Sequence, residues 1–318
     1  MKNQLILRLF LTVLLLFKIG LSLSAAVPVL LDDRLQIGLF VENPDIVTPI
    51  GLAIDAQDRI YVLESHTHTP PPNYQGPKSD RIKVFVDENQ DGRPDKPATI
   101  FAEGMKAGMN LRFSKDGTLY LCSAFEVLAL PDRNGDGKAD DKKVILRLQT
   151  KNTYPHSAQM GIVISTDDWI YVSRGNNGGY AWTLHGSDGS SIQGFGDGGN
   201  VIRCRLDGSQ VQEVATGFWN SMNLKFDAYG RLLLVDNDPD ARGPNRLVQI
   251  VERGDYGYKS LYGGGGNHPF QGWDGTLPGT LGYAASLGEA PCDLIAADRT
   301  SFPKDYRNDL LVSIWNEN

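Results

Sequence analysis

Short apolar segments separated by polar turns recur along this chain, and their starts lie 51 to 69 residues apart. Each copy has an apolar run rich in Val, Ile, Leu and Tyr, then a turn containing Asp, Gly, Asn or Ser, then a second apolar run. Alternating apolar residues bounded by such turns predict a pair of β-strands. The copies span residues 51–63, 110–121, 161–172, 223–235 and, in a more divergent form, 292–314.

This repetition predicts an all-β fold of the β-propeller type. A small twisted sheet cannot bury both of its faces alone, and stacking such sheets as blades around an axis covers them. The alternative is a β-sandwich, which does not explain the near-identical copies. We expect residues 35–41 to add a strand to a closing blade. Because the fifth copy runs almost to Asn318, we also expect the last blade to be truncated.

The N-terminus has a different pattern from the repeats. Basic residues precede a run of almost wholly apolar residues, and Ser24, Ala25 and Ala26 follow as small residues before Val27. This pattern predicts a signal peptide over residues 1–26 and a propeller domain over residues 27–318. An uncleaved anchor is the alternative. No later stretch is apolar enough to cross a membrane, so we expect a secreted or periplasmic protein, with association with the cell envelope left open.

Composition narrows the function classes further. The chain is 41% hydrophobic and 22% charged, which is typical of a globular protein, and its formal net charge is −7. The predicted signal peptide contains basic and no acidic residues, so the remaining chain is still more acidic. An acidic protein is a poor nucleic-acid ligand. The three cysteines are too few and too scattered for a disulfide framework, and we expect them to be small buried residues.

Two acidic loops share the pattern DxNxDGxxD and lie 45 residues apart, at matching places in consecutive repeats. Oxygen atoms at positions 1, 3, 5 and 9 can converge on one hard cation, and Gly at position 6 permits a sharp turn. The alternative is a turn stabilised by its own side chains. The pattern predicts structural calcium sites with the ligands Asp87, Asn89, Asp91 and Asp95 in one loop and Asp132, Asn134, Asp136 and Asp140 in the other.

Several other motifs are weaker. Residues 194–199 satisfy GxGxxG, but a strand-like segment follows where a dinucleotide site needs a helix. His66 and His68 lack a nearby third metal ligand, which favours a polar surface loop over a metal site. His156 precedes the third repeat in a loop, where it could serve as a general base or form hydrogen bonds within a turn.

The chain resembles the propeller sugar dehydrogenases that use pyrroloquinoline quinone (PQQ), and more closely their secreted relatives often called membrane-bound dehydrogenase-like domains. The resemblance is carried by the paired acidic loops and by the segments HSAQMGIVISTDDWIYVSRGNNG, GFWNSMNLKFDAYGRLLLVDND and RLVQIVERGDYGYKSLYG. It extends from about residue 47 to the end of the chain. It implies a propeller of the six-bladed type, of which about five repeats are visible here.

The resemblance also assigns roles to individual residues. His156 matches the base that takes a proton from the sugar hydroxyl, and Asn176 stands where the family has an Asp that orients this base. Trp219 stands where the family has a cofactor-binding Arg, and Asn220 keeps the Asn of that motif. Basic residues that follow a later strand in the family are absent after Leu310. These departures leave the carboxylates of PQQ with fewer cationic partners.

Three functions remain open from the sequence. The first is oxidation of a sugar or alcohol with PQQ as cofactor, His156 as base and an external electron-acceptor protein. The second is a non-catalytic propeller that binds carbohydrate or a protein partner. The third is a calcium-dependent hydrolase of the lactonase type, whose central ion would be held by Glu64, Asn110, Asn220 and Asp236, all near the ends of repeated strands.

Overall fold

The computed structural model describes residues 29–154, 157–239, 242–297 and 302–315. Contacts divide the chain into residues 1–38 and residues 39–318, and residues 29–38 contain no strand or helix. The predicted signal peptide lies outside the described residues. No helix within the described ranges is long and apolar enough to cross a bilayer.

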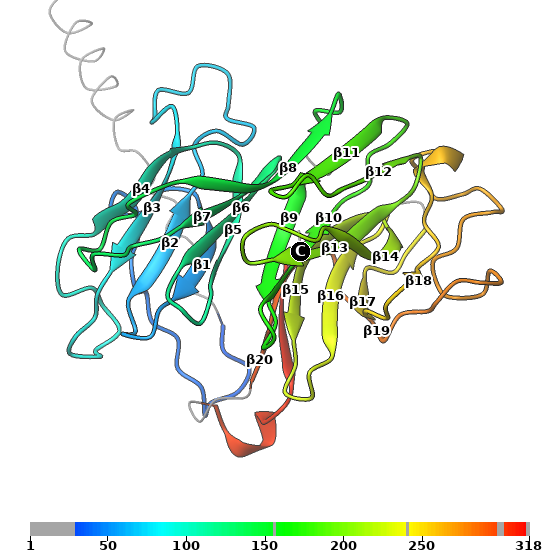
Figure 1. The fold of residues 1–318 in the computed structure, drawn as a ribbon. Helices are drawn as coiled ribbons and strands as arrows, with labels where there is room; N and C mark the ends of the chain where they lie inside the picture. Colours follow the sequence, from blue (N-terminus) through cyan, green and yellow to red (C-terminus); the bar gives the residue numbers. More distant parts are fainter. Residues whose placement is uncertain (1–28, 155–156, 240–241, 298–301, 316–318) are drawn as a thin grey trace, which may run out of the picture. The chain divides into compact units, whose positions relative to one another are not determined.

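Residues 39–318 form five mainly antiparallel sheets, which we call blades 1 to 5 in the order of their first strands (Figure 1). Blade 1 contains β1 (Pro49–Ile54), β2 (Ile60–Glu64), β3 (Asp80–Phe85) and β4 (Thr99–Met105). Blade 2 contains β5 (Gly108–Phe113), β6 (Leu119–Ser123), β7 (Glu126–Leu130) and β8 (Lys143–Thr150), extended by the hairpin β11 (Ala181–Gly186) and β12 (Ser191–Phe195).

Blade 3 contains β9 (Gln159–Ile164), β10 (Trp169–Arg174), β13 (Gly199–Arg205), β14 (Gln212–Phe218) and, parallel to β14, β18 (Gly254–Asp255). Blade 4 contains β15 (Asn220–Phe226), β16 (Leu232–Asn237), β17 (Arg246–Gln249) and β19 (Ala285–Ser286). Blade 5 contains β20 (Pro291–Ala296) and β21 (Leu310–Ile314). The described helices are two 3₁₀ turns, η2 (Ser260–Tyr262) and η3 (Lys304–Tyr306).

The five sequence repeats are the first two strands of the five blades, so the all-β prediction is confirmed. The first strands also contact one another in chain order: β1 with β5, β5 with β9, β9 with β15, and β15 with β20. This succession of inner strands is the arrangement of a β-propeller. The expected strand at residues 35–41 is wrong, since these residues form no strand. The six-bladed count stays a prediction.

The apolar core lies between successive blades rather than within one of them. One cluster joins blades 1 and 2 through residues such as Leu63 and Leu121. Another joins blades 2 and 3 around Ile170, and a third joins blades 3 and 4 around Phe218 and Leu234. Each blade therefore depends on its neighbour to remove its apolar face from water.

The inner strands of neighbouring blades pack closely because, at one equivalent position, glycine and a polar residue alternate from blade to blade. Asn110, Asn223 and Asp293 follow a register shift at the start of their strands, and each side chain accepts the N–H of the next residue. Gly161 occupies the corresponding place in β9, where an added Cβ would lie 2.7 Å from the Cα of Asn223. Blades 3 and 4 can approach this closely because position 161 carries no side chain.

We therefore expect Gly161→Ala to lower the free energy of unfolding by about 1–3 kcal/mol, because the methyl group meets backbone that cannot move without shifting β15. Urea denaturation measures this change. Gly179→Ala is the matched control, since no atom lies within 4 Å of its added Cβ, and it should change stability by less than about 0.5 kcal/mol. Equal effects of the two substitutions would contradict this account of the packing.

Candidate functional site

Three of the residues singled out for catalysis and cofactor binding, Asn176, Trp219 and Asn220, lie where the inner strands of blades 3 and 4 meet. We call this end the axial face: it is where β9 and β15 begin and where β10 and β16 end. The Ser221 hydroxyl donates a hydrogen bond of 3.0 Å to the carbonyl of Arg174, which joins the two blades at this end. His156 lies outside the described residues, so its predicted role as a base stays a prediction.

Asn176 and Trp219 are brought together on the axial face, although they are 43 residues apart in the chain. The backbone N–H and the side-chain amide of Asn176 both donate to the carbonyl of Trp219, at 2.8 and 3.0 Å. The side-chain oxygen of Asn176 accepts the N–H of Gly178. Asn176 therefore links the end of β10 to the start of β15, and it caps its own turn.

The Trp219 side chain is half-buried and forms a hydrogen bond with Tyr258. Burial raises the pKa of Tyr258 to about 12, against the opposing effect of the hydrogen bond from Trp219. The phenol therefore stays protonated at neutral pH. Beside it, Asn220 is buried, and its side-chain oxygen has no hydrogen-bond partner among the described residues. A buried acceptor without a donor is costly, and this oxygen is closed off from solvent beneath the surface.

A buried ion pair supports this surface from beneath. The Asp236 carboxylate accepts the backbone N–H groups of Trp219 and Asn220 at 3.2 and 2.9 Å. The guanidinium of Arg246 donates to the same carboxylate from Nε and Nη2, at 3.0 and 2.9 Å. Burial raises the pKa of Asp236 to about 6, while Arg246 and these hydrogen bonds lower it, so the carboxylate is ionised at pH 7.

Arg246 also anchors the neighbouring loops. It donates to the carbonyls of Gly217, Tyr256 and Trp273, and its guanidinium lies 3.5 Å from the ring centre of Trp273. Arg246 is not among the candidate residues predicted from the sequence. The sequence shows only that a basic residue begins an apolar strand, and an arginine that is buried at such a position normally has a carboxylate partner.

Three of the four residues proposed for a central calcium ion already have partners within the protein. Lys83 and Arg81 hold the carboxylate of Glu64, and Arg246 holds that of Asp236. The side-chain oxygen of Asn110 accepts the N–H of Leu111. Within the described ranges, no group of three or more His, Cys, Asp or Glu residues could hold a metal ion. The observed contacts therefore do not support a lactonase-type centre.

The two acidic loops occupy equivalent positions, as predicted, in the β3–β4 turn of blade 1 and the β7–β8 turn of blade 2. Following the antiparallel strands places both turns at the end opposite the axial face. In the first loop, Asp87 accepts the N–H groups of Asp91 and Gly92, and in the second, Asp132 accepts those of Gly135 and Gly137.

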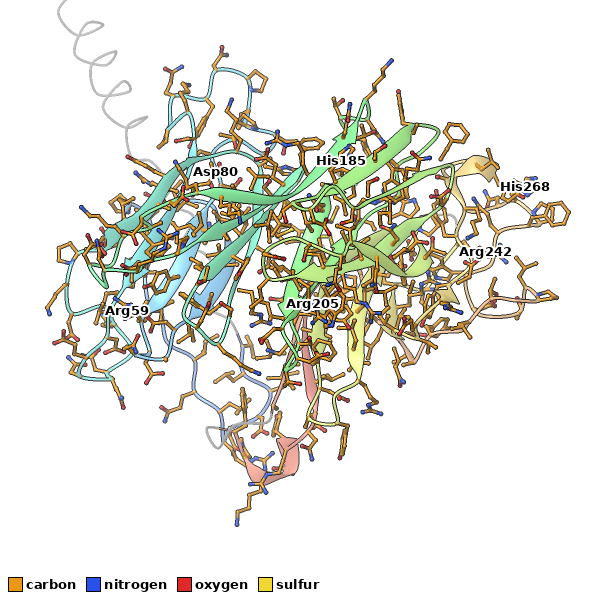
Figure 2. The ribbon with its side chains drawn as sticks, viewed as in Figure 1. Arg59, Asp80, His185, Arg205, Arg242 and His268 are labelled. Carbon is orange, nitrogen blue, oxygen red and sulfur yellow. The ribbon has the colours of Figure 1, made fainter. Side chains whose placement is uncertain are left out.

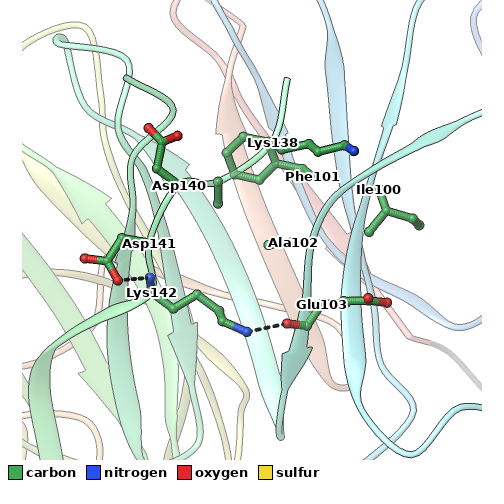
Figure 3. Close-up of a pocket in the computed structure, with 9 residues that line it drawn as sticks. Ile100, Phe101, Ala102, Glu103, Lys138, Asp140, Asp141 and Lys142 are labelled. Carbon is green, nitrogen blue, oxygen red and sulfur yellow. Dashed lines mark hydrogen bonds between the residues drawn. The ribbon is translucent and has the colours of Figure 1, made fainter. Parts of the chain in front are cut away.

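The three Asp side chains of neither loop gather into a metal site among the described residues, but their internal hydrogen bonds do not exhaust their oxygen atoms. An ionised carboxylate has about four acceptor sites on its two oxygens, so a side chain that caps a backbone N–H can still face a cation. The side chains of both loops supply the oxygen ligands that calcium prefers. Asp140 also lines a hollow of about 540 Å³ between β4 and residues 138–142, where the Lys142 ammonium donates to the carbonyl of Glu103 (Figure 3).

The remaining motifs divide into confirmed and wrong predictions. Residues 194–199 connect two strands, β12 and β13, which confirms that they are not a dinucleotide loop. Cys122 and Cys204 are buried, whereas Cys292 is exposed, so the expectation of three buried cysteines is wrong for Cys292. The placement of His66 on a polar surface is also wrong, since this side chain is buried.

The charges on the axial face do not match those of PQQ. This cofactor carries three carboxylates, which need cationic partners when they leave water. Arg246 is already engaged by Asp236, and Arg242 by the carbonyls of Gly266 and Gln271. Arg174 is buried against Asn200 and the ring of Trp182, with its Nη2 unpartnered among the described residues. Figure 2 shows where Arg242 lies. The residues present therefore do not fit a tricarboxylate quinone.

Comparison with known proteins gives one family and a set of similar folds. A family model described as a domain of unknown function (DUF7133) matches residues 25–256. No curated protein sequence matches the chain.

Among solved structures, a glucose dehydrogenase is similar with a TM-score of 0.61 and 15% identity, over 84% of this chain and 80% of that one. The PQQ domain of pyranose dehydrogenase from Coprinopsis cinerea has a TM-score of 0.55 and 12% identity, over 79% and 68%. The calcium structure of an enzyme of carbohydrate-active family AA12 from Trichoderma reesei has a TM-score of 0.51 and 14% identity, over 78% and 70%. At these identities the similarity shows the fold.

We expect Asp236→Ala to lower the free energy of unfolding by about 3–5 kcal/mol, because Arg246 would remain buried without its counter-charge. Urea denaturation at pH 7 measures the loss. Glu252→Ala removes a surface partner of Arg203 and should cost no more than about 1 kcal/mol. A loss for Asp236→Ala as small as that of the control would show that the buried pair does not support the axial face.

Proposed function

The chain belongs to the family of domains of unknown function DUF7133, and we propose that it is a dehydrogenase-like propeller whose axial face binds a neutral carbohydrate. The observation that carries this proposal is the half-buried ring of Trp219 at an end of the propeller whose neighbouring polar groups are the amides of Asn176 and Asn220. An aromatic ring offers a surface for the apolar face of a sugar, and an amide oxygen accepts a hydrogen bond from a sugar hydroxyl.

The electrostatics of the axial face favour a neutral ligand. Asp236 and Arg246 neutralise each other, and Asn176 stands where the family resemblance has an acidic residue. Sugar hydroxyl groups need hydrogen-bonding partners rather than counter-charges, so a surface of amide and aromatic groups suits them. Binding of a protein partner on the same surface is the remaining non-catalytic alternative.

The second candidate is oxidation of a sugar or alcohol, with PQQ as cofactor and an external protein as electron acceptor. The similar fold of the PQQ domain of pyranose dehydrogenase favours it. Against it are the engaged guanidinium groups and the use of Asn176 as a structural link. His156 would be the base, oriented by Asn176, in this candidate function.

Calcium binding and export form the rest of the proposal. Residues 1–26 would direct the chain out of the cytoplasm, into a compartment where calcium reaches millimolar levels, and extracellular calcium modules work at such concentrations. Each acidic loop would hold one ion through its Asp and Asn oxygens. The ions would brace the turns of blades 1 and 2, far from the axial face, and take no part in chemistry there.

Calorimetric titration with neutral oligosaccharides, such as cello-, malto- and xylo-trioses, tests the carbohydrate proposal. We expect saturable binding to one of them, and Trp219→Ala should raise Kd at least about tenfold, because the ring surface is lost. Tyr229→Ala is the matched control: it removes an exposed aromatic from the β15–β16 turn at the opposite end, and it should leave Kd unchanged. No heat from any neutral sugar, in protein shown to be folded, would overturn the proposal.

Titration of the same protein with PQQ in the presence of calcium decides between the two candidates. The first predicts no saturable binding, because the carboxylates would lack partners. One-site binding that Trp219→Ala abolishes would instead support the dehydrogenase.

Calcium binding has its own thermal test. If Kd is about 0.1 mM, then 10 mM calcium stabilises the fold by about 2.7 kcal/mol, so chelation should lower Tm by several degrees. Asp87→Asn and Asp132→Asn should each reduce this response. Glu88→Gln, which changes a surface residue of the same loop that pairs with Lys96, should retain it in full. A Tm that does not respond to calcium would remove the metal from the proposal.

A further inference from the structure

The end of β2 and the loop between β2 and β3, residues 65–79, carry three titratable side chains joined in a row: Glu64, His66 and Tyr74. His66 is 4% exposed, and its Nδ1 lies 2.5 Å from the hydroxyl oxygen of Tyr74. Its Nε2 lies 3.4 Å from Oε2 of Glu64, a long contact. The carboxylate only accepts hydrogen bonds, so in the neutral ring Nε2 carries the proton and Nδ1 accepts from the Tyr74 hydroxyl.

Glu64 is a fixed anchor for this row. It is completely buried, and it binds the Lys83 ammonium at 2.9 Å, the Nε of Arg81, and the N–H of Val47 at 2.9 Å. Burial raises the pKa of this carboxyl, but the hydrogen bonds from Lys83 and Arg81 outweigh burial, and the pKa lies below its usual value. Glu64 is therefore an anion at neutral pH.

Asp80 fixes the start of the loop. Its carboxylate accepts the N–H groups of His66 and Thr67 at 2.7 and 2.9 Å, and that of Gly108 at 2.8 Å (Figure 2). His66 is thus positioned from both its backbone and its side chain.

The position of Tyr74 depends on a glycine two residues later. A Cβ at position 76 would lie 2.0 Å from the hydroxyl oxygen of Tyr74, so any other residue there would displace the ring. The backbone of Gly76 does not adopt a positive φ, which means that close approach alone requires glycine. The loop thus leaves room for Tyr74 to reach His66.

Tyr74 and His66 line a hollow of about 440 Å³, within the usual range for ligand sites. Lys78 and Lys106 also line it, and no acidic side chain does. The Lys78 ammonium lies 5.8 Å from the centre of the Tyr74 ring, and Lys106 has no ion-pair partner among the described residues. Pro70, Pro71 and Pro77 add apolar ring surfaces.

We propose that this hollow binds a carboxylate-bearing sugar, with Lys106 and Lys78 facing the carboxylate, Tyr74 bonded to a hydroxyl, and the proline rings against the apolar face. Glu64 and His66 act as positioning residues for the Tyr74 hydroxyl. No arginine, the residue suited to paired contacts with phosphate, lines the hollow. Trp219 is not among the residues that line the hollow, and the proposal does not rest on the function proposed for the axial face.

Calorimetric titration of the full chain with D-glucuronate and D-glucose tests the proposal, because the two sugars differ only in the carboxylate. We expect saturable binding of glucuronate with Kd on the order of 1 mM at low salt, and at least tenfold weaker binding of glucose. Raising the salt concentration should weaken glucuronate binding. Equal binding of the two sugars, no binding by folded protein, or inorganic sulfate binding as tightly as glucuronate would overturn the proposal.

Variants locate the site and separate it from other surfaces. Tyr74→Phe removes only the hydroxyl, and Gly76→Ala should displace the same ring, so both should raise Kd several-fold while Tm changes little. Lys106→Ala should also raise Kd, whereas Lys96→Ala, a surface lysine at the opposite end, should not. Trp219→Ala should leave glucuronate binding unchanged. An unchanged Kd in Tyr74→Phe and Lys106→Ala would place any binding elsewhere and contradict the assignment.

Discussion

The buried pair of Asp236 and Arg246 connects the fold of this protein to its candidate site. Arg246 cannot remain buried without a carboxylate and carbonyl partners, and it obtains them from blade 4, from the end of blade 3 and from the loop around Trp273. Asp236 in turn uses its remaining oxygen sites on the backbone of Trp219 and Asn220. The start of β15, and with it the shape of the axial face, follows from satisfying one buried guanidinium.

The same pair explains why the likeness to quinone-dependent dehydrogenases extends to fold more than to chemistry. A propeller that bound a tricarboxylate cofactor would need free cations at its axial face. Around Trp219 the cations are used internally, and the groups at the axial face are a half-buried tryptophan ring and buried amides. Blade 1 shows the opposite arrangement, because Glu64 is buried among basic groups while the ammonium of Lys106 faces solvent at the hollow. The solvent-facing positive charge therefore lies at the hollow of blade 1 and not beside Trp219.

Much of the architecture could be predicted from repetition alone. The five hairpins coincide with the five copies, because strand periodicity and turn residues are local properties. The prediction failed where no local pattern decides the outcome. Residues 35–41 look like a strand and form none, and the hairpin of β11 and β12 follows blade 3 strands in the chain but pairs with β8 of blade 2. Which edge accepts a strand depends on which edge is free after the blades have stacked.

The sequence by itself determined the strand pairs, the acidic turns and the departures from the dehydrogenase motifs, because each depends only on residues that are close together in the chain. Only the tertiary structure decided which side chains meet. Asn176 binds the carbonyl of Trp219, Arg246 neutralises Asp236, and His66, judged from its neighbours to be on the surface, is buried between Glu64 and Tyr74. The physical reason is that burial and hydrogen bonding are properties of the packed chain: a polar residue takes its partner from whichever strand or loop the fold brings within about 3 Å.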